Sequence, residues 1–185
     1  MMINLVSYLS ENVKSAVRTL GDLCRMNKTR KLKLDKRYTP FPTNEGDEIY
    51  PNGIFNFNIS RILEHIMAGK LDVEKELINV SEWFKTHFRG SVNEEHLPMI
   101  DIREPVLQAE IRPGMFEIID GNHRMEKACR DNVEFVNSYK LKGEQLLAFF
   151  ADKRGYEAFV EYWNSKLRKA CMAKRYKMLL LLCMF

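Results

Sequence analysis

Residues 116–128 have the sequence Phe-Glu-Ile-Ile-Asp-Gly-Asn-His-Arg-Met-Glu-Lys-Ala, and this stretch decides the fold. The apolar run that ends at Ile119 predicts a strand, and the residues that follow Gly121 predict a helix. A strand that passes directly into a helix leaves backbone N–H groups without intrahelical partners at one exposed point. The partial positive charge of the helix N-terminus adds to these donors. Such a junction favours an anion, and phosphate above all.

The side chains of this junction suit the same ligand. Gly121 has no Cβ, so the chain can adopt a positive φ there and a phosphate oxygen can approach the backbone. We expect Asn122 to cap the helix, and His123 and Arg124 to supply donors, the arginine as a planar fork. With Asp120, these residues form the predicted nucleotide-phosphate site. The alternative is an ordinary turn with a cap and a surface charge, but glycine, histidine and arginine converge on one junction.

The pattern of the rest of the chain predicts an α+β fold, a small mixed sheet surrounded by helices. Before the junction we expect a strand at 54–58, a helix from a Ser60 cap to Gly69, a helix at 73–88, and strands at 98–102 and 106–111. After it we expect a strand at 133–140 and helices at 144–151 and from 156 onward. The predicted regions are an amphipathic helix (3–24) with a basic linker in 1–47, a core in 48–142, and helices with a basic, apolar tail in 143–185.

Composition predicts one soluble domain, because 185 residues with 45% hydrophobic and 29% charged side chains can bury a core. The net charge of +4 is concentrated in residues 25–37 and 166–177. These basic segments are either solvated faces or contacts with DNA or an anionic membrane. The four cysteines have no metal-ligand spacing, so a zinc site is not expected. No secretory signal is evident, which predicts a cytoplasmic location.

Residues 118–128 resemble the I-D-G-x-H-R-x-x-A-A signature of the ParB/sulfiredoxin superfamily. The resemblance extends over about 49–141 and implies a loop that holds the phosphates of a nucleotide, expected to be ATP with Mg²⁺. It implies Mg-dependent nucleotide hydrolysis with DNase activity, as in a plasmid-encoded inhibitor of DNA transfer. Asn122 stands where sulfiredoxin has its catalytic cysteine, so reduction of sulfinic acids is not expected. The arginine-rich box of chromosome-segregation ParB is absent as well.

The chemistry of phosphoryl transfer suggests roles for individual side chains. His123 would donate to phosphate or orient water, Arg124 would offset charge in the transition state, and Glu126 completes the expected catalytic set. Glu64, with Asp120 or Glu126, would hold Mg²⁺. Arg61 would reach a phosphate from a neighbouring helix. The simpler alternatives are an exposed helical glutamate for Glu64 and a surface charge for Arg61.

The end of the chain predicts partners of another kind. Residues 178–185 are wholly apolar but too few to span a bilayer, which needs about 20 apolar residues. They would either contact a membrane surface peripherally or pack on the amino-terminal helix. A rival function follows, in which a non-catalytic protein at the inner-membrane surface blocks a secretion-system or conjugation coupling protein through its termini.

Overall fold

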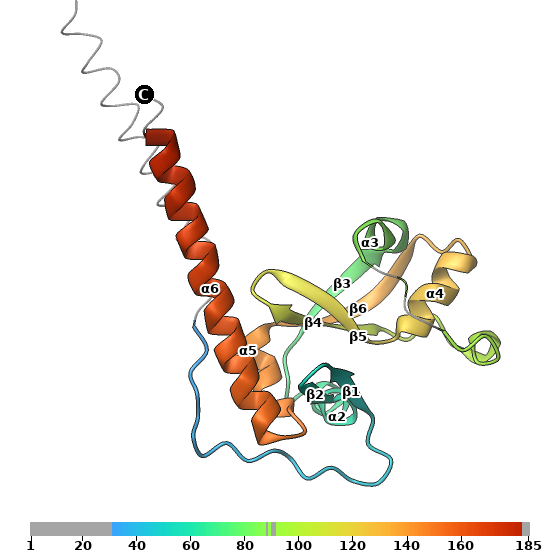
Figure 1. The fold of residues 1–185 in the computed structure, drawn as a ribbon. Coiled ribbons are helices and arrows are strands. Elements are labelled where there is room, and N and C mark those ends of the chain that lie inside the picture. Colours follow the sequence, from blue (N-terminus) through green and yellow to red (C-terminus); the bar gives the residue numbers. More distant parts are fainter. Residues whose placement is uncertain (1–30, 88, 90–91, 183–185) are drawn as a thin grey trace, which may run out of the picture. The chain divides into compact units, whose positions relative to one another are not determined.

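The computed structural model describes residues 31–87, 89 and 92–182, with side chains as far as 169. The helix expected at 3–24 and residues 183–185 lie outside the described residues. A four-stranded sheet has the strand order β3-β6-β4-β5, and β1 and β2 form a separate hairpin (Figure 1). The strands are β1 (Ile49–Asn52), β2 (Phe55–Asn58), β3 (Glu74–Asn79), β4 (Val106–Arg112), β5 (Met115–Asp120) and β6 (Phe135–Leu141). The predicted α+β fold with a small mixed sheet is confirmed.

Helices connect these strands and cover the sheet. The α-helices are α2 (Ile59–Met67), α3 (Val80–Thr86), α4 (Asn122–Arg130), α5 (Gly143–Leu146) and α6 (Lys153–Leu182). Two 3-10 turns, η1 (Leu97–Met99) and η2 (Leu147–Phe149), complete the described elements. The central strands β4 and β6 run parallel, whereas β3 pairs with β6 and β5 with β4 in antiparallel fashion. The connection from β4 to its parallel neighbour therefore includes β5 and α4.

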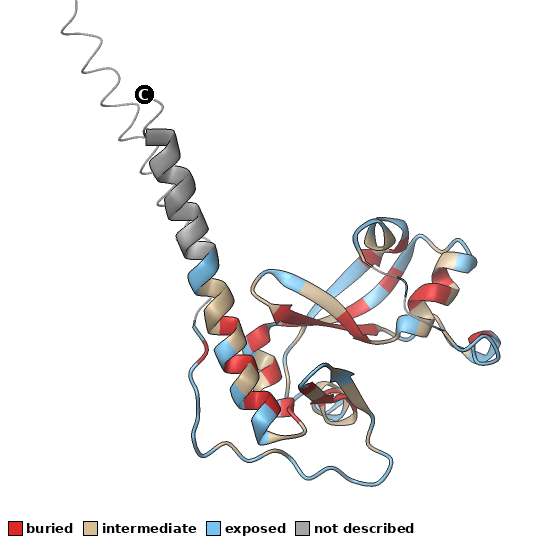
Figure 2. Cartoon of the chain, in the orientation of Figure 1, coloured by how far each residue is buried: buried red, intermediate tan, exposed pale blue. Residues whose placement is uncertain are grey.

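Strand side chains alternate between the two faces of the sheet, so each face carries a hydrophobic core of its own. One core is larger than the other. The larger core joins one face to β2, α5 and the first half of α6 (Figure 2). Its fully buried members include Phe57, Ile59, Leu107, Ile119, Leu141, Phe150, Phe159 and Trp163. The smaller core, on the other face, packs α3 and α4 against the sheet. It contains Ile78, Val80, Val106, Ile118, Met125, Ala128 and Val136.

The helix predicted at 73–88 is wrong in its first half, which is strand β3. β3 pairs with β6 along its whole length, and Asn79 ends it by capping α3 through its side chain, which accepts from the Glu82 N–H. Leu77, whose spacing suited the buried face of a helix, is 62% exposed because its side chain lies on the opposite face of β3 from Ile78, which is buried in the smaller core. The apolar spacing suited a helix, but strand pairing and the asparagine cap outweigh it.

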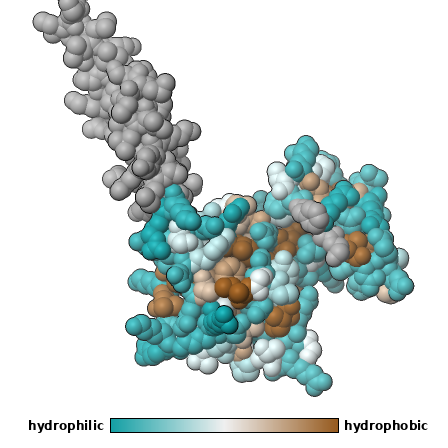
Figure 3. Space-filling model, in the orientation of Figure 1, coloured by the Kyte–Doolittle hydropathy of each residue, from teal (hydrophilic) through white to brown (hydrophobic). Residues whose placement is uncertain are grey.

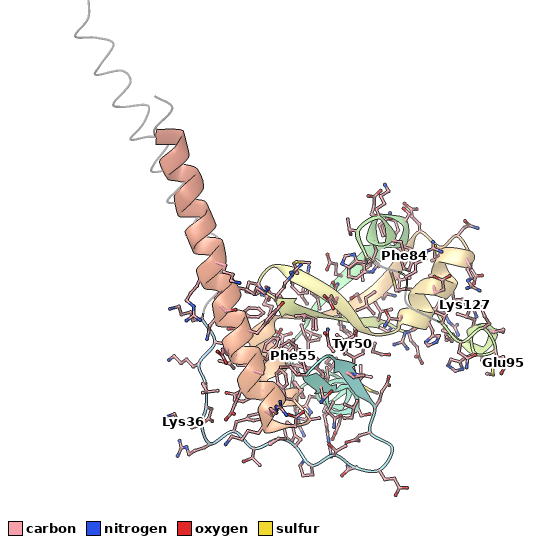
Figure 4. All side chains as sticks on the ribbon, in the orientation of Figure 1. Lys36, Tyr50, Phe55, Phe84, Glu95 and Lys127 are labelled. Atoms are coloured by element: carbon pink, nitrogen blue, oxygen red, sulfur yellow. The ribbon has the colours of Figure 1, made fainter. Side chains whose placement is uncertain are left out.

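The strand predicted at 98–102 is also wrong. This segment forms η1 and a loop, and the ammonium of Lys127 on α4 donates to the carbonyl oxygens of Pro98 and Ile100. Figure 4 shows Lys127 on α4 close to the turn that carries Glu95. These bonds hold the 92–100 segment against α4. The carbonyl oxygens of Pro98 and Ile100 are thus satisfied by Lys127 and not by a neighbouring strand.

The β1–β2 hairpin differs from the prediction in two respects: β1 was not predicted, and the residue that caps α2 is a different one. β2 confirms the strand expected at 54–58, whereas β1 has no counterpart among the predicted strands. The cap of α2 is Asn58, not Ser60, because the Asn58 side chain accepts from the Arg61 N–H. The Ser60 hydroxyl instead accepts from the N–H of Glu48. This places Glu48 at the entrance to β1.

Residues that precede the hairpin are fixed to α6. The side-chain amide of Asn164 bonds both the N–H and the carbonyl oxygen of Leu32, at 3.0 and 2.9 Å. The hydroxyl of Tyr156 accepts from the N–H of Asp35, and its ring stacks on Tyr38. Burial raises the pKa of Tyr38 to about 12. Among the described helices, none has both the length and the apolar character needed to cross a bilayer.

Candidate functional site

The predicted junction has the expected backbone. β5 ends at Asp120, Gly121 adopts φ +92°, and α4 begins at Asn122. Gly121 is therefore the cap residue, and its carbonyl oxygen accepts from the N–H of Met125. The expectation that Asn122 caps the helix is wrong: Asn122 is the exposed first helical residue, and no described side chain accepts from the first N–H groups of α4. Those donors remain available to an anion.

Gly121 is required for packing as well as for its dihedral angle. A Cβ at this position would lie 2.8 Å from Arg124 Nε and 2.8 Å from Val106 Cγ1. Both distances are far shorter than a carbon atom tolerates, and Val106 belongs to the small core. A side chain at position 121 would therefore displace Arg124, strain the backbone and disturb the core at once.

Arg124 folds back over the junction. Its Nη2 donates to Asp120 Oδ2 at 2.5 Å, and its Nη1 donates to Glu104 Oε2 at 3.2 Å. The side chains of Arg124 and Asp120 are each 16% exposed, whereas that of Glu104 is 68% exposed. The buried Nε of Arg124 has no hydrogen-bond partner among the described residues. The guanidinium is thus held firmly on the Asp120 side and weakly on the Glu104 side.

A third carboxylate, Glu48, belongs to this site. Burial raises the pKa of Glu48, the charge of Asp120 raises it further, and the charge of Arg124 partly opposes both. The hairpin that follows Glu48 also contacts β5, because Asn52 Nδ2 donates to Glu117 Oε2 at 3.2 Å. Tyr50, labelled in Figure 4, lies in the same hairpin, and burial and Glu117 raise its pKa. The sequence gives no signal for Glu48, because no motif surrounds it.

His123 faces the segment that η1 belongs to. Its Nε2 accepts from the N–H of Asn93 at 3.1 Å, which places the ring proton on Nδ1. The ring of His96 lies perpendicular to that of His123, with centroids 5.8 Å apart. No motif surrounds His96 in the sequence, so the sequence alone indicates only an ordinary polar residue. The structure instead makes it a neighbour of the junction.

The other predicted site residues lie in separate ion pairs. Glu126 is buried and accepts from Arg130 Nε at 2.9 Å, with Arg89 Nη1 at 3.7 Å. Glu64 pairs with Arg61 at 2.7 Å, and Arg61 Nε lies 3.9 Å from Asp47. Both glutamates are therefore in ion pairs with arginines, and neither of these ion pairs includes Asp120.

Metal binding at the junction would rest on few protein ligands. Nowhere in the described part of the chain do three histidine, cysteine or acidic side chains gather closely enough to hold an ion. Mg²⁺ commonly uses one or two carboxylates and takes its other ligands from water and substrate phosphates. At the junction, the candidates for that smaller set are Asp120 and Glu48, whose charges interact. No family model, curated protein or solved structure matches the chain.

Proposed function

We propose that the β5–α4 junction binds the phosphates of a nucleotide, expected to be ATP, and hydrolyses it with Mg²⁺, accompanied by cleavage of DNA phosphodiesters. The observation that carries the proposal is Gly121 at φ +92°, which opens a helix with uncapped N–H groups beside Arg124 and His123. The resemblance of residues 118–128 to the ParB/sulfiredoxin signature supports a nucleotide as the ligand. The same electrophilic arrangement suits any phosphate ester.

The charges around the junction favour binding of phosphate together with a metal ion. Arg124 pairs with the carboxylates of Asp120 and Glu104, and its charge also interacts with that of Glu48. A phosphate alone would be repelled by this excess of negative charge. Glu48 and Asp120 would hold Mg²⁺, which would supply charge neutralisation at the phosphate oxygens. Nucleotide binding is therefore expected to depend on Mg²⁺.

Groups of the protein would supply the other interactions with the phosphates. The N–H groups of Asn122 and His123 would bind phosphate oxygens. Arg124 would exchange its exposed contact with Glu104 for a phosphate and keep its bond to Asp120, since an exposed ion pair contributes little. His123, whose Nε2 is engaged, would use Nδ1–H to donate to phosphate or to orient water. Glu126 would position α4 through Arg130 and Arg89.

Ligand-dependent stability tests the proposal directly. ATP with Mg²⁺ should raise the melting temperature, because a ligand at 100 times its Kd stabilises the native state by about 2.7 kcal/mol. ATP without Mg²⁺, and Mg²⁺ alone, should have little effect. Scanning fluorimetry with ATP, CTP and ADP measures the shift, and phosphate release and nicking of supercoiled plasmid measure turnover. The absence of any Mg-dependent shift with these nucleotides would contradict the proposal. A shift without turnover would favour the rival, a binding protein with nucleotide as a switch.

The pH dependence of stability tests Glu48. Its raised pKa means that the native state binds this proton more tightly than the unfolded chain does. The resulting stabilisation is present below the ordinary value of 4.5 and is lost as pH rises through the raised pKa. Glu48→Gln, which mimics the neutral form, should flatten this dependence and match or exceed the parent's stability at pH 7. It should also weaken the Mg-dependent effect of ATP.

Glu45→Gln is the matched control for this prediction, because Glu45 is an exposed glutamate in the same segment. It should leave both the pH profile and the ATP effect unchanged. Denaturant unfolding from pH 4 to pH 8 provides the measurement. If Glu48→Gln behaves like Glu45→Gln, Glu48 has no part in the site.

A further inference from the structure

The helices α3 and α4 cover only part of the sheet face that carries the smaller core. Beyond Ile78 and Val106 the cover of α3 ends, and a groove of about 530 Å³ lies between α3 and the strands. Its lining comes from all four strands and α3, and includes Glu76, Trp83, His87, Gln108, Phe116 and Lys140. The volume is within the range of small-molecule sites. The face of the molecule shown in Figure 3 carries apolar patches among hydrophilic side chains.

The floor of the groove consists of three polar side chains where a closed core would have apolar ones. Gln108 is only 2% exposed, and its Nε2 donates to Glu76 Oε2 at 3.0 Å. Lys140 Nζ lies 2.7 Å from the same oxygen. Gln108 and Lys140 are register partners on the parallel strands β4 and β6. These mutual bonds hold polar groups in fixed positions, and such pre-organisation lowers the entropic cost of ligand binding.

Aromatic rings form the sides of the groove. Trp83 of α3 stacks on His87 with centroids 3.7 Å apart and an interplanar angle of 6°. The His87 Nε2 lies 3.2 Å from the carbonyl oxygen of Phe116, which ties α3 to β5. The ammonium of Lys140 lies 4.8 Å from the centre of the Phe116 ring. The rings are therefore fixed on both sides of the polar floor.

The charge of the groove selects a neutral ligand. Glu76 and Lys140 neutralise each other, and Glu82 at the rim pairs with Lys85. Beyond its bond to Glu76, the primary amide of Gln108 retains one N–H and its oxygen, and this donor and acceptor suit a ligand edge with the same pair of groups. Flat aromatic walls suit a flat ring. We propose that this groove binds a small, uncharged, planar heteroaromatic molecule with an amide-like edge, of the nucleobase type.

This site is distinct from the phosphate junction. The groove takes its β5 residues from the end of the strand at Met115 and Phe116, whereas the junction lies at the other end, after Asp120. No phosphate donor of the junction lines the groove, and Lys140 and Lys85 are already paired with Glu76 and Glu82, so an added phosphate would find no free cation among these groups. A free base should therefore bind at least as tightly as its monophosphate, which a nucleotide site at the junction would not predict.

Tryptophan fluorescence tests the proposal, because the chain has two tryptophans and Trp163 lies in the larger core. In Trp163→Phe the emission comes from Trp83 alone. Adenine and uracil, titrated separately, should quench it, at least one of them saturably, and adenosine monophosphate should bind no more tightly than adenine. Gln108→Leu in the same background should weaken binding about tenfold or more, by loss of a bidentate pair. Glu74→Gln, on the same strand as Glu76 but outside the groove, is the control and should bind as the parent does.

Saturation-transfer NMR of adenine with the unaltered chain provides the same readout if Trp163→Phe does not fold. Phe116→Ala provides a second variant if Gln108→Leu does not fold, and it should also weaken binding. The absence of saturable binding by both adenine and uracil overturns the proposal. Binding that is unchanged in Gln108→Leu or Phe116→Ala, or that requires the phosphate, overturns it as well.

Discussion

Gly121→Val is expected to abolish nucleotide binding at the junction, with a loss in affinity on the order of 100-fold or more. A valine at φ +92° is strained by about 1–3 kcal/mol. Its Cβ would also overlap Arg124 and Val106, so the guanidinium must leave Asp120. Gly121→Ala should have the same effects to a smaller degree. Titration calorimetry with ATP and Mg²⁺ measures the affinity, and denaturant unfolding measures the stability.

Gly53→Val separates backbone strain from loss of the site. Gly53 also has a positive φ, +62°, but no described atom lies within 4 Å of the position of its Cβ. This control should lose stability and keep its affinity for ATP. If Gly121→Val remains folded and binds ATP as Gly53→Val does, the junction is not the nucleotide site.

Arg124→Ala is expected to reduce ATP hydrolysis by a factor on the order of 10² to 10³, the usual cost of one charge-stabilising donor. Arg124→Lys should restore hydrolysis only in part, because an ammonium cannot reproduce the planar fork. The pattern of residues alone predicts little loss of stability on removal of a surface arginine. The structure predicts more, about 1–3 kcal/mol, because Asp120 would lose its partner while Glu48 remains near.

Arg103→Ala is the matched control, because Arg103 is an 88% exposed arginine that pairs with Asp101. It should keep both hydrolysis and stability. Phosphate release under saturating ATP and Mg²⁺ measures the first, and denaturant unfolding measures the second. Hydrolysis at the parent rate by a folded Arg124→Ala protein would remove Arg124 from the reaction.

The sequence predicted the junction because its signals are local. Apolar residues that run into Asp-Gly identify a strand followed by a tight change of direction, and the positive φ of Gly121 confirms that interpretation. The neighbours of Arg124 could not be predicted in the same way. Glu48 and Glu104 are ordinary acidic residues, and only the packing of the β1–β2 hairpin and of the loop before β4 brings the charge of Glu48 to the junction and Glu104 to Arg124.

The failed prediction at 73–88 has a different cause. Leu77, Val80, Trp83 and Phe84 have helical spacing, yet the first of them is exposed on a strand and the others pack from a helix. The long-range pairing of β3 with β6 decides this segment, and a local pattern contains no information about that partner. The groove beside α3 was not predicted for the same reason, because its floor is assembled from three different strands.

The parallel pairing of β4 with β6 determines when the junction can become functional during folding. β4 and β5 are joined by a short hairpin, whose closure is local and fast. β6 can join them only after the chain has passed through Gly121 and α4, and β3 must then be recruited from much earlier in the sequence. Contacts of such wide separation form slowly. We therefore expect the β5–α4 junction to form late in folding, and a nascent chain that ends before β6 would carry the motif without the strand that completes the sheet.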